Sequence, residues 1–278
     1  MWCWMNGEYV QSEDLRVSPF DHGFLYGLGF FETFRTYDGD VFLWEDHCKR
    51  LQRALDDYHI VLPYSFDELL AVIRELDKRC DGEDGYFRLN VSAGVHDIGL
   101  KPTSYTEPTV IVFRKPLPKM VRGEEKSAVW LNTERNSPEQ SIRHKSHHYA
   151  NNVIARFEVP SLAELEGFFV NGDGFVAEGI TSNIFWVTDG KVYTPSIETG
   201  ILPGITRGQV MQQITVIEGF YTREQLEQAD ECFITTSIQE LIPIRSLQGK
   251  NFLGNNGPVY KALHEQYVKS INDVKGRS

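Results

Sequence analysis

The sequence predicts a mixed α/β protein with two domains, and three observations support this fold class. Segments with alternating apolar residues and segments with apolar residues three or four apart occur in both halves of the chain. A length of 278 residues is enough for one large domain or two ordinary ones. The run 115–118, Lys-Pro-Leu-Pro, has the composition of a linker. We therefore expect a smaller domain over residues 1–115, a linker over 116–122 and a larger domain over 123–278.

The first domain is expected to combine short strands with two helices. Asn6-Gly7 and Asp38-Gly39 are strong signals for hairpin turns. Ser65, followed three residues later by Glu68, forms a capping box that predicts the start of a helix. The expected elements are strands at 30–37, 41–44, 86–93 and 109–113, and helices at 45–58 and from residue 65.

The predicted strand 86–93 has one apolar and one polar face. Residues 87, 89, 91 and 93 are apolar, whereas Arg88, Asn90 and Ser92 point the other way in an extended chain. We expect the polar face to meet either solvent or a functional site.

The second domain is expected to hold most of the strands, with turns at 171–174 and 189–190. A helix after Lys145 carries Val153, Ile154 and Phe157. The other expected elements are strands at 128–132, 168–170, 175–177, 183–187, 191–193, 232–235 and 241–247, and helices from about 206, from 223 and at 259–271.

Composition excludes several classes of function. A net charge of -11 and a pI near 5.2 argue against a nucleic-acid partner, which requires a basic surface. The four cysteines are far apart and form no C-x-x-C pair, which fits a reducing cytoplasm. We expect no signal peptide, because the first residues lack a basic region and a long apolar run, and no membrane segment.

Six short motifs follow one another along the chain. They are FETFR (31–35), HCKRL (47–51), KSHHY (145–149), EGITSNIF (178–185), GILPGITR (200–207) and TTSIQELIPI (235–244). In this order they resemble the fold-type IV pyridoxal-phosphate enzymes over nearly the whole chain. That family includes branched-chain aminotransferases, D-amino-acid aminotransferases and aminodeoxychorismate lyases. The resemblance implies a smaller N-terminal and a larger C-terminal α/β domain, pyridoxal 5'-phosphate in the cleft between them, and a homodimer.

The resemblance also implies roles for individual residues. Lys145 is expected to form the Schiff base with the cofactor, and its neighbours Arg143, His144, His147 and His148 to help keep its amine neutral. Glu178 is expected to keep the pyridine nitrogen protonated, so that the ring can act as an electron sink. The expected phosphate contacts are the guanidinium of Arg50, the backbone amides of Ile205 and Thr206 with the Thr206 hydroxyl, and the hydroxyl of Ser237. The neighbouring Thr235 and Thr236 are the alternatives to Ser237.

Within the family, residues 18–27 and 145–149 look most like the lyases, which convert 4-amino-4-deoxychorismate to 4-aminobenzoate and pyruvate for folate synthesis. Thr33 stands where branched-chain aminotransferases have glycine and D-amino-acid aminotransferases have valine, and its hydroxyl is a candidate proton donor. The substrate's two carboxylates call for arginines. Arg35 and Arg88 are the candidates, with Arg143 behind them.

Other interpretations stay open. A D-amino-acid or branched-chain aminotransferase would use the same cofactor residues, and a non-catalytic pyridoxal-phosphate-binding protein is the alternative that is not an enzyme. His144 and His148 would share a face if they lay on a helix, but no third metal ligand is evident, so we expect no metal. No G-x-S-x-G, P-loop or G-x-G-x-x-G motif is present.

Overall fold

The computed structural model describes residues 1–275, with side chains up to residue 273. The chain forms two compact units. The first consists mainly of residues 1–118 and 144–148, and the second of residues 119–143 and 149–273. The five residues 144–148 thus belong with the first unit, although the sequence on both sides of them belongs to the second.

The first unit contains a six-stranded sheet in the order β2-β1-β6-β5-β3-β4, with all neighbours antiparallel. Both predicted hairpin turns are confirmed, because Asn6, Gly7, Asp38 and Gly39 all have positive φ. The strands are β1 (Trp2–Met5), β2 (Glu8–Gln11), β3 (Gly29–Tyr37), β4 (Asp40–Val41), β5 (Gly85–Ser92) and β6 (Thr109–Pro116).

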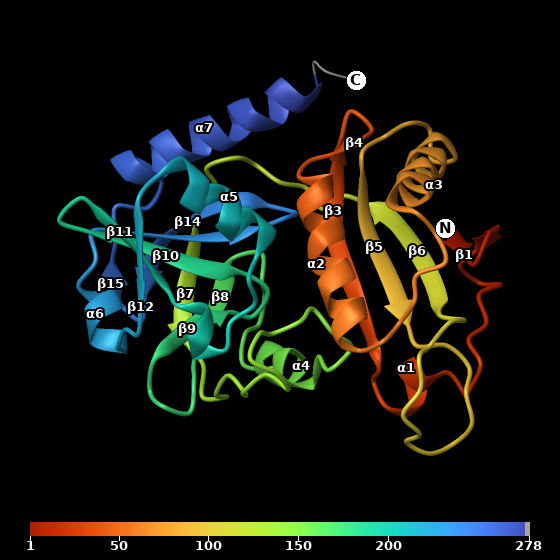
Figure 1. Cartoon of the computed structure of the whole chain (residues 1–278). Coiled ribbons are helices and arrows are strands. Elements are labelled where there is room, and N and C mark those ends of the chain that lie inside the picture. Colours follow the sequence, from red (N-terminus) through yellow and green to blue (C-terminus); the bar gives the residue numbers. More distant parts are fainter. Residues whose placement is uncertain (276–278) are drawn as a thin grey trace. The chain divides into compact units, whose positions relative to one another are not determined.

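Three helices belong to the first unit: α1 (His22–Leu25), α2 (Trp44–Asp57) and α3 (Phe66–Lys78). In Figure 1, α2 runs alongside β3, and α3 lies near β6. The predicted capping box opens α3, since the Ser65 hydroxyl accepts from the backbone of Glu68 while the Glu68 carboxylate accepts from the backbone of Ser65. The strand predicted at 41–44 pairs with β3 as expected, but it ends at Val41. Leu43 adopts a left-handed conformation at the N-cap of α2, so the following residues are helical.

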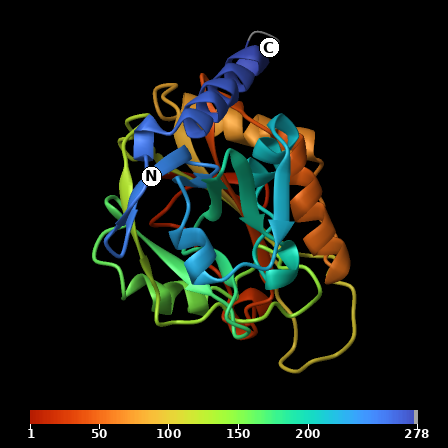
Figure 2. The same ribbon diagram turned by 90° about the vertical axis from the view of Figure 1, so that its left-hand side faces the viewer.

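The two faces of β5 differ as the alternation predicted. The side chains of residues 87, 89, 91 and 93 are buried in a core with apolar residues of α2 and α3. Arg88 and Asn90 lie on the other face. The loop of residues 93–108, which joins β5 to β6, extends past the ends of these strands (Figures 1 and 2).

The second unit contains a mixed sheet in the order β12-β11-β10-β13-β14-β7-β8-β9, with β15 paired to β14. Three neighbouring pairs are parallel, namely β11 with β12, β14 with β7 and β7 with β8. The strands are β7 (Lys126–Trp130), β8 (Leu165–Val170), β9 (Val176–Gly179), β10 (Asn183–Thr188), β11 (Lys191–Pro195), β12 (Val216–Gly219), β13 (Glu231–Thr236), β14 (Glu240–Leu247) and β15 (Lys250–Asn251).

The helices of the second unit are α4 (Ala150–Arg156), α5 (Ile205–Gln213), α6 (Arg223–Glu227) and α7 (Pro258–Lys275), with short 3-10 turns at Ile197–Thr199 and Gly254–Asn256. The long helix α7, blue in Figures 1 and 2, buries one face through Tyr260, Leu263 and Tyr267.

Helix α4 is present where the sequence predicted it, but its apolar residues point outward. Val153, Ile154 and Phe157 are exposed, whereas Asn152 and Ala155 are buried. Asn152 is satisfied in this buried position because its side-chain amide donates to the carbonyl of Ile180 at 2.6 Å.

Among the described residues, no helix combines the length and the apolar character that crossing a lipid bilayer requires.

Candidate active site

Lys145 lies on a short extended segment that pairs with the start of β3. The backbone N–H of Phe31 donates to the Lys145 carbonyl at 2.9 Å, and that of His147 donates to the Gly29 carbonyl at 2.8 Å. Phe30 and Ser146 form an antiparallel bridge between these two hydrogen bonds. Since directly opposed residues in an antiparallel pair point to the same face, Lys145 shares a face with Phe31.

The same face carries the residues for which the sequence predicted substrate chemistry. Phe31 is opposite Asn90 in the register of β3 and β5, and Thr33 is opposite Arg88. Arg35 lies two residues further along the same face of β3. The first unit thus brings Thr33, Arg35 and Arg88 onto the face of the sheet to which Lys145 points.

Two cations lie over the ring of Phe31. The guanidinium carbon of Arg88 is 3.5 Å from the ring centre, and Nζ of Lys145 is 4.6 Å from it. The guanidinium of Arg35 instead lies 4.4 Å from the ring centre of Tyr37, further along β3. Of the two arginines predicted for the substrate, Arg88 is therefore the one that shares a contact with Lys145.

His147 does not supply the positive charge that the sequence suggested. Burial and the nearby guanidinium of Arg88 lower the pKa of His147 to about 4, so its imidazole is neutral at pH 7. Its Nε2 lies 2.9 Å from the side-chain oxygen of Asn90.

The other two histidines of this segment are directed to separate groups. Nε2 of His144 is 2.9 Å from a carboxylate oxygen of Asp57, and Nε2 of His148 is 3.2 Å from the carbonyl of Tyr26. The idea that His144 and His148 share a helix face was wrong, because the segment is extended and α4 begins only at residue 150.

Arg50 is held by the buried carboxylate of Glu32, a residue of the FETFR motif for which no role was predicted. Two guanidinium nitrogens of Arg50 donate to Glu32 at 2.8 and 2.6 Å, and Nδ1 of His47 lies 2.7 Å from Glu32. Burial alone raises the pKa of Glu32, but Arg50 and His47 outweigh it and lower the pKa to about 2. Glu32 alternates with Phe31 and Thr33 along β3, so it points toward α2 and fixes the orientation of Arg50 there.

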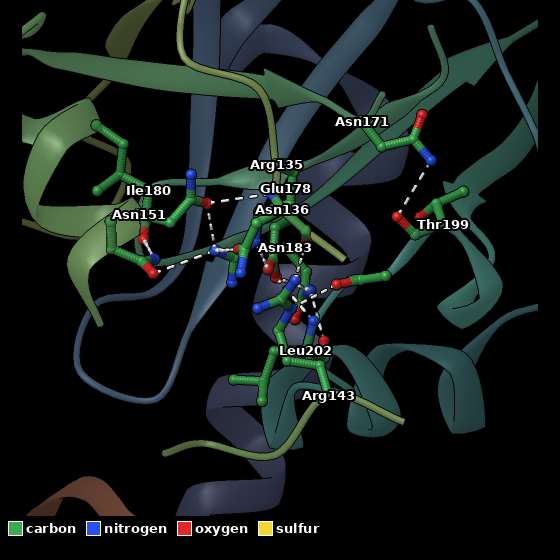
Figure 3. A network of polar contacts seen from close by, with 12 residues as sticks. Arg135, Asn136, Arg143, Asn151, Asn171, Glu178, Ile180, Asn183, Thr199 and Leu202 are labelled. Atoms are coloured by element: carbon green, nitrogen blue, oxygen red, sulfur yellow. Dashed lines mark hydrogen bonds and ion pairs between the residues drawn. The ribbon is translucent and has the colours of Figure 1, made fainter. Parts of the chain in front are cut away.

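Glu178 is the centre of a buried network in the second unit, shown in Figure 3. Its carboxylate accepts from Nε of Arg135 at 2.9 Å, from the backbone of Leu202 at 3.0 Å and from the amide of Asn183 at 3.3 Å. Glu178 is 4% exposed, so this charge depends on these donors. The arrangement suits an ionised carboxylate next to a protonated ring nitrogen.

Arg135 was not predicted, and it links Glu178 to the helix that follows the Lys145 segment. Its Nη1 donates to the side-chain oxygens of Asn151 at 2.7 Å and Asn152 at 3.2 Å (Figure 3). A buried arginine whose Nε and Nη1 donate to oxygen atoms can hold Glu178 in one position. Nothing in the local sequence of Arg135 indicates this partner, which is 43 residues away.

Arg143 has a structural role in the same network. Its Nε donates to the carbonyl of Gly200 at 2.5 Å and its Nη2 to the carbonyl of Asn136 (Figure 3). Burial and the charge of Arg135 lower its pKa to about 10. Two of its nitrogens thus hold backbone carbonyls within the second unit, and a role for Arg143 behind Arg35 and Arg88 stays a prediction.

The start of α5 has the features of a phosphate site. Helix α5 begins at Ile205 without a side-chain cap, so its first backbone N–H groups have no partner within the helix. The hydroxyls of Thr206 and Thr235 are buried and have no hydrogen-bond partner. A side chain at Gly204 would clash with Asn183, which also contacts Glu178. These unpaired donors and the missing side chain fit a phosphate group.

Ser237 lies in the turn after β13 and is half-buried. The hydroxyl of its neighbour Thr236 accepts from the backbone of Gln239 at 2.7 Å, so Thr236 stabilises the turn. Thr235 is the residue of this run whose buried hydroxyl has no partner. Of the two threonines that the sequence left as alternatives to Ser237, Thr235 is therefore the candidate phosphate ligand.

Comparisons with known proteins agree with this geometry. The family model described as amino-transferase class IV matches residues 29–247. The aminodeoxychorismate lyase of Bacillus subtilis is 42% identical over 98% of this chain and 95% of its own. The D-alanine aminotransferase of Staphylococcus epidermidis is 30% identical over 96% of each chain.

Solved structures of branched-chain aminotransferases have the same fold. The enzyme of Thermoproteus uzoniensis, solved with norvaline, has a TM-score of 0.86 and 28% identity, and the match covers 98% of this chain and 95% of that one. Other solved members of this group contain N-(5'-phosphopyridoxyl)-L-glutamate or pyridoxamine 5'-phosphate. The chain belongs to the class IV aminotransferase family, the fold-type IV enzymes that its motifs resemble.

Proposed function

We propose that this enzyme is an aminodeoxychorismate lyase that releases 4-aminobenzoate and pyruvate from 4-amino-4-deoxychorismate. The observation that carries the proposal is the position of the Thr33 hydroxyl, on the same face of β3 as Lys145 and opposite Arg88. The 42% identity to the lyase of Bacillus subtilis supports it.

Pyridoxal phosphate is the cofactor of this enzyme. When bound, it supplies an electron sink that stabilises negative charge at the carbon next to the substrate's amine. We propose that Lys145 holds it covalently and that Glu178 binds its ring nitrogen. The proposed phosphate ligands are Arg50, Ile205, Thr206, Ser237 and Thr235.

We propose that Arg88 binds one carboxylate of the substrate. Arginine suits this task because its planar guanidinium can donate two parallel hydrogen bonds to a carboxylate. Arg88 and Lys145 both lie over the ring of Phe31, so a substrate bound by Arg88 has its reacting carbon near the amine. Arg35 is the weaker candidate because it lies over Tyr37.

The side chains of the protein carry out two proton transfers in the proposed reaction. The amine of Lys145 takes the proton from C4 of the substrate, and the bond between C3 and the enolpyruvyl oxygen breaks. Thr33 donates or relays a proton to the departing oxygen, and the released enol becomes pyruvate. The ring becomes aromatic as 4-aminobenzoate, so the reaction needs no oxidant, water or keto acid.

We also propose that the enzyme acts as a homodimer in the cytoplasm. The exposed apolar residues Val153, Ile154 and Phe157 of α4 support a protein contact at this surface. The four cysteines are free, which fits a reducing compartment. Light scattering of the purified protein tests the dimer, because a mass of one chain would contradict it.

The role of Thr33 is tested by comparing Thr33→Val with Thr33→Ser. We expect the valine variant to lower kcat for release of 4-aminobenzoate by about 10²-fold, since a positioned acid contributes at least that much. The serine variant keeps a hydroxyl and is expected to retain most of the activity. Equal kcat values in the wild type and Thr33→Val would show that this role is wrong.

A transaminase is the second candidate, supported by the 30% identity to a D-alanine aminotransferase. It predicts that D-alanine bleaches the visible band of the lysine-bound cofactor and that a keto acid restores it. A protein that binds the cofactor but turns over neither substrate would be the non-catalytic alternative.

A further inference from the structure

Gly29 allows the Lys145 segment to reach across β3. On the face that carries Phe31, Gly29 lies between His147 on one side and Ser92 of β5 on the other. A Cβ atom on Gly29 would clash with the imidazole of His147. Because glycine has no side chain, the imidazole passes over the strand, and its Nε2 comes within 2.9 Å of the side-chain oxygen of Asn90.

The side-chain oxygen of Asn90 is shared by two groups. Besides Nε2 of His147, it accepts from Nε and Nη2 of Arg88, each at 3.3 Å. Because a guanidinium can only donate, the atom of Asn90 that faces Arg88 must be the oxygen, and His147 must therefore be the donor at Nε2. Asn90 thus joins the segment that carries Lys145 to the arginine that lies over Phe31.

A neutral acceptor suits this position. An amide oxygen orients the guanidinium of Arg88 without cancelling its charge, whereas a carboxylate would form an ion pair with it. His147 contributes no charge at pH 7, since burial and Arg88 lower its pKa to about 4, outweighing the opposite effect of Asp21. Neither Asn90 nor His147 therefore cancels the positive charge of Arg88.

We infer that Asn90 is a positioning residue that sets the distance between the amine of Lys145 and the guanidinium of Arg88, and so determines how a substrate carboxylate is bound. The inference rests on the proposed role of Arg88 in the function described above. It does not depend on the lyase reaction, because a D-amino acid also carries a carboxylate next to its amine.

The test compares Asn90→Leu with Asn90→Asp in the holoenzyme, using KM and kcat for aminodeoxychorismate. We expect KM to rise about tenfold in Asn90→Leu, the loss expected when a hydrogen bond to a charged group is removed. We expect a larger rise in Asn90→Asp, because its carboxylate competes with the substrate for Arg88. In both variants kcat is expected to change by less than about threefold, since the proton-transfer groups remain.

Which of the two variants has the higher KM distinguishes a positioning role of Asn90 from a structural one. Aspartate has nearly the shape of asparagine, so a merely structural role predicts that Asn90→Asp is closer to the wild type than Asn90→Leu. A smaller rise in KM for Asn90→Asp than for Asn90→Leu, or an unchanged KM in both variants, would overturn the inference.

Gly29→Ala is expected to raise KM as Asn90→Leu does, because it displaces His147 from Asn90. Lys115→Ala, which removes an exposed charge on β6 opposite Tyr86 of β5, serves as the control with unchanged KM.

Two further measurements keep the test independent of the lyase proposal. If the wild type releases no 4-aminobenzoate, the same variants are compared by the D-alanine concentration that half-saturates bleaching of the cofactor band, and the same order is expected. NMR titration of the histidine ring protons is expected to show a higher pKa for His147 in Asn90→Asp than in the wild type, because a carboxylate favours the protonated ring. An unchanged titration of His147 would contradict the contact with residue 90.

Discussion

The Lys145 face of the first unit and the Glu178 network of the second are built in different ways. Lys145 and Arg88 lie over one aromatic ring, and a single amide oxygen of Asn90 orients Arg88. Glu178 is buried and accepts from three donors, one of them Arg135, whose remaining contacts are side-chain oxygens. The first arrangement includes cation–π contacts of about 0.5–2 kcal/mol. The second is built on buried charged hydrogen bonds.

The difference fits the tasks that we propose for the two regions. Lys145 has to exchange partners during each turnover, and its cation–π contact with Phe31 costs little to break. Glu178 has to keep one charge in one place, and a buried carboxylate that loses its partner costs several kcal/mol. The start of α5 combines both properties, since its backbone is fixed while the hydroxyls of Thr206 and Thr235 remain without a partner.

The largest effect is expected for Lys145→Ala. Removing the amine removes the proposed base and the covalent link to the cofactor, so kcat should fall by at least about 10³-fold. The visible band of the lysine-bound cofactor should also be absent, whereas Lys191→Ala, an exposed lysine of the second unit, should change neither quantity. Substantial turnover in Lys145→Ala would contradict the assignment of this face to the chemistry.

Arg135→Leu tests whether the Glu178 network depends on a buried ion pair. We expect the free energy of unfolding of the second unit to fall by about 3–5 kcal/mol, because Glu178 is left buried without a charged partner. Arg74→Leu is the control, since the Arg74–Asp40 pair is half-exposed and should cost less than about 1 kcal/mol. Urea unfolding measures both, and similar costs for the two variants would contradict the distinction between the pairs.

Glu32→Gln removes the ion pair with Arg50, and we expect this to change how the free energy of unfolding depends on pH. The folded pKa of Glu32 is about 2, against an ordinary value of 4.5, so the ionised form stabilises the fold above pH 4.5. This contribution is about 3 kcal/mol at pH 7 and is lost as the pH falls from 4.5 to 2. The unfolding free energies of wild type and Glu32→Gln should therefore differ at pH 7 and converge at low pH.

The control for this pH profile is Glu75→Gln, because Glu75 forms a half-exposed pair with Arg79. Its effect should stay below about 1 kcal/mol throughout. A difference between wild type and Glu32→Gln that does not shrink below pH 4.5 would contradict the ionised pair.

The smallest effect is expected for Thr206→Val, which removes a hydroxyl without changing the shape of the side chain. The apo protein should unfold at the same urea concentration, because this buried hydroxyl has no partner to lose. Binding of the cofactor should weaken about tenfold, because a hydrogen bond to a charged phosphate is lost. Fluorescence titration of the apo protein with pyridoxal phosphate measures this change.

Thr194→Val provides the matched control for Thr206→Val. The buried hydroxyl of Thr194 donates to the carbonyl of Ile184 at 2.8 Å, so its loss should destabilise the fold by about 1 kcal/mol and leave cofactor binding unchanged. If Thr206→Val behaved in the same way as Thr194→Val, the start of α5 would be a structural element and not the phosphate site.

Local sequence signals predicted much of the fold. The helical spacing predicted both ends of α2 to within one residue, and the capping box predicted the start of α3. The alternation of apolar residues predicted which side chains of β5 lie on each face. Contacts between distant residues were not predictable. Residues 144–148 join the first unit through backbone pairing with β3 and side-chain contacts with residues far away in the sequence. Strand β12 forms by parallel pairing with β11.

The same contrast between local sequence signals and contacts of distant residues applies to the candidate site. Lys145, Glu178 and Thr206 could be proposed because each lies in a short motif, and their surroundings in the structure suit the proposed roles. The partners that hold such residues were missed, because Arg135 contacts Glu178 from 43 residues away and Glu32 contacts Arg50 from 18 residues away. The outward direction of the apolar residues of α4 was also missed, since burial of Asn152 depends on its bond to Ile180.

The most direct test of the account supplies the purified holoenzyme with aminodeoxychorismate and no keto acid, and follows 4-aminobenzoate and pyruvate together. The account predicts that both are released in equal amounts over many turnovers. No release from a protein that shows the band of the lysine-bound cofactor, together with bleaching of that band by D-alanine, would contradict the lyase and identify the enzyme as a transaminase.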